Sequence, residues 1–367
     1  MTITLKTIDA HVGGQPLRLV VDGFPSPPGR TMFEKRDWVR RKKDHLRRAL
    51  MLEPRGHGDM SGAVLTEAVS PGSHAGVVFL HNDGYSTMSG HGIIAVTTIA
   101  LERGLLMPGG DGKTVVYDVP AGTIRAEATL GSSFDAGNAG KHPTAVTGFS
   151  AHRAAHDGIE PATMSHVGPR VARVGVVGVP SFVLHGGLSV KLGTRHIRAD
   201  VAFGGGFYAI VDSEAVGLPL DASHLPELRR LGMDIKEAIE AGQDIVHPLD
   251  QRLRGLAGTI FTGPPHHLSA DLRNVTVFAD AQVDRSPCGA GTAAVMAVLE
   301  AIGLLSDNRP FVHESILGTQ FEGRVCGREP VADYEAILAE VSGSAWITGE
   351  HTFCIDDADP LKNGFKV

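Results

Sequence analysis

The chain has 367 residues, 42% of them hydrophobic, and a formal net charge of −7 at pH 7. This length is sufficient for two domains with their own hydrophobic cores, and three cysteines are too few for a disulfide-stabilised module. The acidic balance excludes a general electrostatic attraction to nucleic acid or anionic membranes, and no apolar run is long enough to span a membrane.

The first part of the chain predicts short strands separated by glycine-containing turns. His-Val-Gly-Gly at 11–14 indicates a turn, and Pro-Arg-Gly-His-Gly-Asp-Met at 54–60 indicates a glycine-rich loop. Apolar or alternating stretches predict strands over residues 2–10, 18–21, 63–66 and 75–81.

Residues 31–50 are strongly basic, which suggests a nucleic-acid contact. However, Phe33, Val39, Leu46 and Leu50 recur at roughly helical spacing. In an acidic chain this pattern favours an amphipathic surface helix whose charged face is solvated.

A glycine turn and an apolar helix are predicted from Ser89 onward. The stretch begins Ser-Gly-His-Gly, carries no charge before Glu102, and closes with Gly-Leu-Leu at 104–106. A helix without a polar face is buried on all sides.

Strands at 115–119 and 123–130 flank Pro-Ala-Gly at 120–122, and we place a domain boundary at this break. The first domain is predicted to contain residues 1–121 and a returning tail, 345–367, and the second residues 122–344. In the second domain we expect a helix over 224–241 and strands over 171–177, 181–185, 259–262, 274–279, 321–326 and 334–341.

Two glycine-rich stretches of the second half resemble nucleotide-binding sequences. The triple at 204–206 lacks the Lys-Ser/Thr of a phosphate loop, so a tight turn between strands is favoured. Residues 289–294 fit G-x-G-x-x-A, but they lie deep in the second half and repeat an earlier segment, which disfavours a dinucleotide site.

That earlier segment is the one beginning at Ser89. At a constant offset of 199 residues, Gly90 aligns with Gly289, the closing Gly-Leu-Leu with a second Gly-Leu-Leu, and Ser89 with Cys288. The first turn of each helix exposes free N–H groups and the positive end of the helix dipole, which suits an anion. Cys288 at such a position is predicted to have a lowered pKa and to act as base or nucleophile. Cys326 and Cys354 are predicted to be buried structural residues.

Two such helix starts facing each other would hold one carboxylate between them. Ser89 would then lie on one face of the bound molecule and Cys288 on the other. This arrangement suits proton transfer at the carbon next to the carboxylate.

The sequence resembles the proline racemase family, which includes hydroxyproline epimerases and trans-3-hydroxy-L-proline dehydratases. The resemblance covers nearly the whole chain and rests on motifs at 8–14, 53–60, 88–92, 203–207, 284–289 and 345–349. It implies an α/β fold like that of diaminopimelate epimerase, in which two pseudo-symmetric domains each curl a mixed sheet around a central helix. The active site then lies at the domain interface, and neither metal nor cofactor is required.

By position, the family's catalytic residues correspond to Ser89 and Cys288. The resemblance implies that Asp284 and the His91 side chain receive the ring nitrogen of the substrate. It also implies that the substrate carboxylate is held by the backbone of Gly90, His91, Gly289 and Ala290.

Two positions depart from the racemase pattern: Ser89 replaces a cysteine and Ala290 a threonine. Because a serine hydroxyl is too weak an acid to match a thiol, we expect Cys288 to remove the Cα proton and a β-hydroxyl to leave. The predicted activity is therefore dehydration of trans-3-hydroxy-L-proline to pyrroline-2-carboxylate. Alternatives are a 4-hydroxyproline 2-epimerase, a binding protein without turnover, and an acyl-transfer Cys/His enzyme.

The predicted partner is a small-molecule substrate, hydroxyproline, with no nucleic acid and no membrane, for a monomer or homodimer. The first residues, Met-Thr-Ile-Thr-Leu-Lys, lack the apolar region of a signal peptide. Together with the odd cysteine count, this leads us to expect the cytoplasm.

Overall fold

The structure is a computed structural model that describes residues 2–108, 110, 112–131, 168–306 and 308–366. The helices are α1 (Met32–Lys42), α2 (Asp44–Met51), α3 (Gly90–Glu102), α4 (Ser213–Val216), a 3₁₀ helix (Ala222–His224), α5 (Leu225–Gly242) and α6 (Gly289–Ala301). The strands are β1 (Thr2–Val12), β2 (Gln15–Asp22), β3 (Ser61–Thr66), β4 (Ala75–His81), β5 (Tyr85–Ser86), β6 (Thr114–Val119), β7 (Gly122–Leu130), β8 (Val171–Val177), β9 (Ser181–Leu192), β10 (Arg195–Phe203), β11 (Phe207–Asp212), β12 (Leu256–Gly263), β13 (Leu272–Phe278), β14 (Gln282–Asp284), β15 (Phe311–Glu314), β16 (Gln320–Arg328), β17 (Ala336–Gly343) and β18 (Ala345–Asp356).

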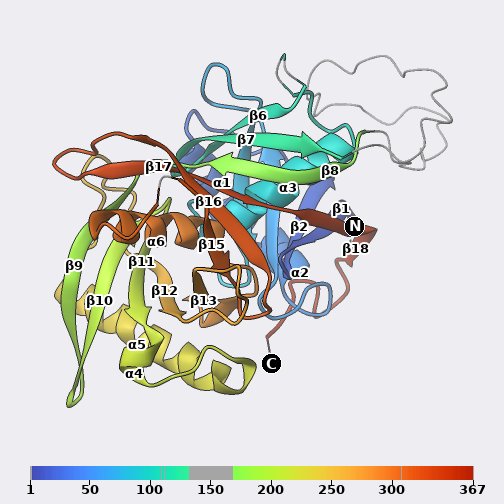
Figure 1. The fold of residues 1–367 in the computed structure, drawn as a ribbon. Coiled ribbons are helices and arrows are strands. Elements are labelled where there is room, and N and C mark those ends of the chain that lie inside the picture. Colours follow the sequence, from blue (N-terminus) through green and yellow to red (C-terminus); the bar gives the residue numbers. More distant parts are fainter. Residues whose placement is uncertain (1, 109, 111, 132–167, 307, 367) are drawn as a thin grey trace.

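All of these strands are hydrogen-bonded into one continuous mixed sheet. Most neighbours are antiparallel, but β2 and β3, β4 and β6, β11 and β12, and β13 and β15 run parallel. The sheet curls around α3 in one half of the molecule and around α6 in the other (Figure 1). The prediction of a mixed α/β fold with central helices is confirmed.

Helix α3 is enclosed by β1, β2, β3, β7, β8, β17 and β18, and every residue from Gly90 to Leu101 is buried. Helix α6 is enclosed by β9, β10, β11, β16 and β17, and it is buried from Gly289 to Val298. Both helices therefore lack a polar face because both are core elements, as their sequences predict.

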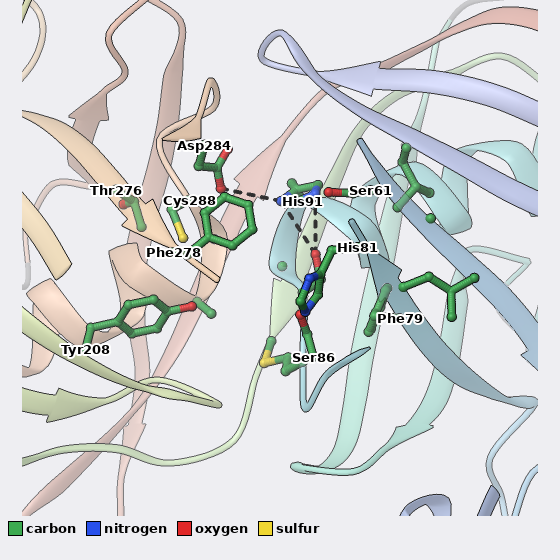
Figure 2. A pocket seen from close by; sticks show the side chains of 18 residues that line it. Ser61, Phe79, His81, Ser86, His91, Tyr208, Thr276, Phe278, Asp284 and Cys288 are labelled. Carbon is green, nitrogen blue, oxygen red and sulfur yellow. Dashed lines mark hydrogen bonds and ion pairs between the residues drawn. The ribbon is translucent and has the colours of Figure 1, made fainter. Parts of the chain in front are cut away.

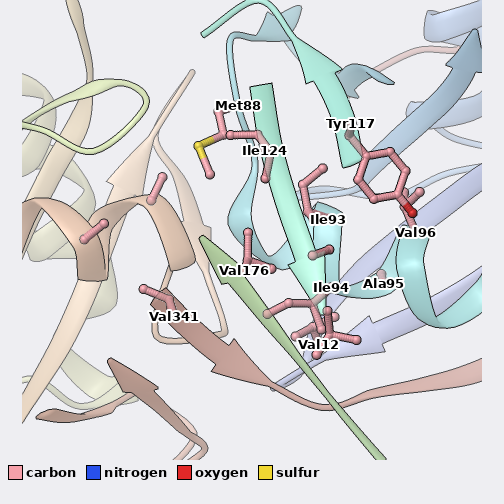
Figure 3. Close-up of a cluster of buried hydrophobic side chains, with 14 of the residues drawn as sticks. Val12, Met88, Ile93, Ile94, Ala95, Val96, Tyr117, Ile124, Val176 and Val341 are labelled. Carbon is pink, nitrogen blue, oxygen red and sulfur yellow. The ribbon is translucent and has the colours of Figure 1, made fainter. Parts of the chain in front are cut away.

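One hydrophobic cluster includes side chains from both central helices. Figure 3 shows the part around α3, where Ile93 and Ile94 lie among side chains from strands that are distant in sequence, such as Val12, Val176 and Val341. The two halves thus share a continuous core, which holds the starts of α3 and α6 in a fixed relation.

The C-terminal strand β18 pairs antiparallel with β1 along its whole length, from Thr2 opposite Asp356 to Val12 opposite Ala345. Strands β7 and β8, which lie beyond the predicted boundary at residue 121, pack against α3. The break at 120–122 itself is the tight connection of a β6–β7 hairpin. The division into residues 1–121 plus 345–367 and 122–344 stays a prediction.

The basic segment differs from the prediction because it forms two helices, α1 and α2, rather than one. Two of its cations are also buried rather than solvated: Lys35 is 3% exposed and Arg47 is 6% exposed. Lys35 donates to Thr66 Oγ1, and Arg47 donates to the carbonyl oxygens of His81 and Asn82. A buried cation requires such hydrogen-bond acceptors, and these bonds connect α2 to the end of β4.

Other boundaries also differ in detail. Residues 11 and 12 continue β1, so the predicted turn is confined to the two glycines, both of which have positive φ angles. Strand β17 begins at Ala336 rather than at residue 334, and β5, β14, β15 and α4 were not predicted. The glycine triple at 204–206 forms the predicted turn between β10 and β11.

Cys326 and Cys354 are both exposed, so the prediction that they are buried was wrong. In β18 the neighbour of Cys354, Ile355, is buried, and alternation along the strand turns the Cys354 thiol outward. No helix of the described residues is sufficiently long and apolar to cross a membrane.

His313 in β15 gives the fold a pH dependence. Its side chain is fully buried, and its Nδ1 lies 2.9 Å from Thr292 Oγ1 in α6. Burial lowers the pKa of His313 from 6.5 to about 3, and burial likewise lowers that of His81 to about 4. Both histidines are therefore neutral in the folded protein at neutral pH.

We expect the free energy of unfolding to decrease as the pH falls below 6.5. Below pH 6.5 the histidine of the unfolded chain binds a proton, whereas His313 in the folded protein stays neutral down to about pH 3. The contribution of His313 to stability is therefore fully present above pH 6.5 and is lost progressively as the pH falls from 6.5 toward 3. This histidine alone accounts for about 2 kcal/mol between pH 7 and pH 5. Urea unfolding at the two pH values measures the loss, and His313→Gln should reduce it. An unchanged pH dependence in the variant would contradict this assignment.

Candidate active site

Ser89 is the N-cap of α3. Its backbone is extended, with φ −144°, and its Oγ accepts a hydrogen bond from the N–H of Gly92 at 3.1 Å. Such a cap satisfies one of the free N–H groups at the helix start. Because Oγ acts as an acceptor inside the helix start, its own hydrogen remains available as a donor.

Cys288 is the equivalent residue of α6, but its backbone is strained. Its φ is +63°, a region that costs a non-glycine residue about 1–3 kcal/mol. The turn before it is fixed by Asp284, whose Oδ1 accepts from the N–H and the hydroxyl of Ser286 at 2.9 and 2.7 Å. Ser286 Oγ in turn accepts from the N–H of Cys288 at 3.2 Å.

The two helix starts meet at Gly90 and Gly289. A methyl group placed on Gly90 would lie 2.6 Å from the Cα of Gly289, and one placed on Gly289 would lie 2.7 Å from the Cα of Gly90. Only residues without a side chain allow this approach. The two helix starts therefore touch at the repeated glycines, and Gly90, His91, Gly289 and Ala290 line one pocket.

His91 and Asp284 come from opposite halves and face each other. The His91 Nδ1 lies 3.6 Å from the Asp284 Oδ2, and both side chains are buried (Figure 2). The Oγ of Ser89 lies 3.5 Å from both ring nitrogens of His91. An oxygen equidistant from both nitrogens is aligned with neither, so these contacts are weak.

A single pocket is lined by all the site residues predicted from sequence. They are Ser89, Gly90, His91, Asp284, Cys288, Gly289 and Ala290. The same pocket is lined by side chains that sequence reasoning missed, among them Ser61, His81, Tyr208, Thr276 and Phe278 (Figure 2). A weak signal existed for two of these: Tyr208 follows the glycine triple closely, and Thr276 is a polar residue inside an apolar strand.

The predicted lowering of the Cys288 pKa was wrong. Cys288 is 7% exposed, and burial of its thiol, together with the charge of Asp284, raises the thiol pKa above the ordinary value. Hydrogen bonds from the Gly291 backbone and from Thr276 and Tyr208 act in the opposite direction but are outweighed. Desolvation of a thiolate exceeds the effect of the helix dipole here, so the thiol is protonated at neutral pH.

Tyr208 also belongs to this charged environment. Burial, followed by the charges of Cys288 and Asp284, raises its pKa well above 10. Its phenol is therefore protonated and can donate a hydrogen bond.

Within the described ranges, no group of three His, Cys, Asp or Glu side chains is arranged to hold a metal ion.

The chain is similar to known proteins over almost its whole length. The family model described as Proline racemase matches residues 7–139 and 147–366. The chain is 40% identical to trans-3-hydroxy-L-proline dehydratase of Bacillus cereus over 98% of this chain and 97% of that protein. It is 35% identical to proline racemase of Clostridioides difficile over 99% and 98%.

A solved structure shares the whole fold. It is a hydroxyproline epimerase from Agrobacterium vitis with bound trans-4-hydroxy-L-proline, 27% identical to this chain, with a TM-score of 0.82. The alignment covers 100% of this chain and 96% of that one.

Proposed function

Because the chain belongs to the proline racemase family, we propose that it is a cofactor-independent hydro-lyase that converts trans-3-hydroxy-L-proline into pyrroline-2-carboxylate. The observation that carries this proposal is the unequal pair, Ser89 and Cys288, at helix starts that face one pocket. The similarity to trans-3-hydroxy-L-proline dehydratase of Bacillus cereus supports it.

The substrate carboxylate binds between the backbone N–H groups of Gly90, His91, Gly289 and Ala290. The contact between the two helix starts supports this site, because it brings two positive dipole ends together. The ring nitrogen, a cation before reaction, lies between His91 and Asp284. Asp284 is the buried carboxylate of the pocket and is suited to hold that charge.

Cys288 removes the Cα proton as a thiolate. The charge of Asp284 disfavours the thiolate, but the ammonium group of the substrate offsets that carboxylate. Substrate binding thus lowers the pKa of the base that acts on it. The carbanion that forms expels the hydroxyl on the neighbouring carbon, and the enamine product tautomerises to the cyclic imine.

Ser89 makes inversion at Cα slow. A hydroxyl is a much weaker acid than a thiol, and His91 is not aligned to assist it. Delivery of a proton to the second face of the carbanion is therefore slower than loss of the hydroxyl. This inequality favours dehydration over epimerisation.

The second candidate function is 4-hydroxyproline 2-epimerisation. The solved relative with trans-4-hydroxy-L-proline bound favours it. A substrate without a 3-hydroxyl has no leaving group, so slow inversion is the only outcome available to its carbanion.

Incubation with proline and with its 3- and 4-hydroxy isomers in deuterated water tests both candidates. Dehydration yields the imine from trans-3-hydroxy-L-proline. Epimerisation instead returns the inverted amino acid with deuterium at Cα. The absence of imine at high enzyme concentration would refute the proposed dehydration.

We expect Ser89→Cys to raise the epimerisation rate of trans-4-hydroxy-L-proline about tenfold or more, because a thiol delivers the second proton more readily. Chiral chromatography measures the rate. Ser269→Cys, which adds a thiol to an exposed loop, is the matched control and should change nothing. Equal epimerisation by Ser89→Cys and wild type would mean that this position does not decide the reaction.

We also propose the cytoplasm as the compartment. The three cysteines are free, and the exposed thiols of Cys326 and Cys354 suit a reducing environment. The expectation of a monomer or homodimer stays a prediction.

A further inference from the structure

The stereochemistry of the proposed substrate restricts which residue helps the hydroxyl to leave. This step rests on the proposed function. In trans-3-hydroxy-L-proline the hydroxyl and the carboxylate occupy opposite faces of the ring. The hydroxyl therefore shares its face with the Cα hydrogen. The base that takes the hydrogen and the acid that protonates the hydroxyl must approach from the same side, which is the side of Cys288.

Most hydroxyl groups of the pocket lie on the other wall. They are Ser61 in β3, Ser86 in β5 and Ser89 at the start of α3, and these elements belong to the half of the molecule opposite Cys288. The wall around Cys288 offers only two hydroxyls among the lining residues, those of Thr276 in β13 and Tyr208 in β11. Both line the same pocket as Cys288, and interaction with each of them lowers the pKa of its thiol.

Thr276 is the poorer candidate of the two. Its Oγ1 donates to the Asn274 Oδ1 at 3.3 Å, so its proton is engaged within β13. Tyr208 is 7% exposed, and Figure 2 shows its ring reaching into the pocket on the Cys288 side. A phenol is also a stronger acid than an aliphatic alcohol.

We propose that Tyr208 is the general acid that protonates the leaving hydroxyl and that Cys288 then returns the proton to Tyr208. The Cα–H bond breaks as the S–H bond forms on Cys288. The C3–O bond breaks as the phenol proton moves to the departing oxygen, which leaves as water. The phenolate then takes the proton from the neighbouring thiol. Thiolate and phenol are restored, and the substrate has lost one water in total.

Tyr208→Phe tests the assignment because it removes the hydroxyl and keeps the ring. We expect the kcat for dehydration to fall about 100-fold or more, the usual range for loss of a general acid, with a smaller change in KM. Tyr117→Phe is the matched control, since Tyr117 is fully buried and bonds to Thr97 in the α3 core, away from the pocket. That variant should retain wild-type kcat.

A substrate whose leaving group needs no proton separates an acid from a structural role. The 3-chloro analogue of the same configuration loses chloride after Cα deprotonation alone. Wild type and Tyr208→Phe should therefore release chloride at rates within about threefold of each other.

Each result has a defined meaning. Equal losses of dehydration and chloride release in Tyr208→Phe would show that Tyr208 acts on Cys288 and would overturn the inference. Dehydration by Tyr208→Phe at the wild-type rate would also overturn the inference. So would a wild-type enzyme that dehydrates trans-3-hydroxy-L-proline but does not release chloride from the chloro analogue. A wild type that does not dehydrate trans-3-hydroxy-L-proline refutes the proposed function instead.

Discussion

Replacing Cys288 with alanine is expected to reduce dehydration of trans-3-hydroxy-L-proline about 10³- to 10⁴-fold, because the variant has no base on the face that carries the Cα hydrogen. Ser89 cannot substitute, since it lies on the other wall and is a weak base. The variant should still bind substrate through the two helix starts. Imine formation, followed by spectrophotometry, measures the rate, and calorimetry measures binding.

Cys326→Ala and Cys354→Ala are the matched controls. Both thiols are exposed on β16 and β18, away from the pocket, and both variants should retain wild-type turnover. If Cys288→Ala kept more than a tenth of the wild-type rate, another residue would have to be the base, and the proposed mechanism would fail.

Gly289→Ala is expected to lower kcat/KM about 100-fold and to destabilise the fold by about 1–3 kcal/mol. The added methyl would lie 2.7 Å from the Cα and 3.0 Å from the carbonyl carbon of Gly90. Backbone atoms cannot rotate out of the way as a flexible side chain would. The starts of α3 and α6 must therefore separate, and the N–H groups that hold the carboxylate move with them.

Gly242→Ala makes the same chemical change at the end of α5, where an added methyl meets nothing within 4 Å. It should leave activity unchanged, because alanine is also the better helix former. Urea unfolding and steady-state kinetics of the two variants measure the difference. Wild-type kinetics in Gly289→Ala would contradict the idea that the approach of the two helices is required for catalysis.

Several features of the site were predictable from sequence for a physical reason. An apolar helix with no charged face has to be buried, and glycines at its start allow close approach and an anion. The same pattern occurring twice, 199 residues apart, indicated two equivalent helix starts. Ser89 and Cys288 were identified because each precedes one of them.

Surface and strand details were less predictable. Residues 31–50 have helical spacing throughout, but the spacing does not show that Arg47 is buried. Its partners are the carbonyl oxygens of His81 and Asn82, which lie far away in the sequence. Cys326 and Cys354 were expected inside the protein, yet strand alternation turned them outward. Tyr208 was missed because only the packing of β11 beside α6 brings its phenol to Cys288.

The sequence by itself determined the two buried helices and the residues at their starts, because burial and glycine turns depend on local patterns, and its resemblance to the proline racemase family implied the mixed fold. Only the tertiary structure decided the protonation of Cys288. Burial and the charge of Asp284 both raise the thiol pKa, whereas the helix start lowers it. It also decided which hydroxyl shares the face of the base, because that pairing joins strands and helices that are remote in the chain.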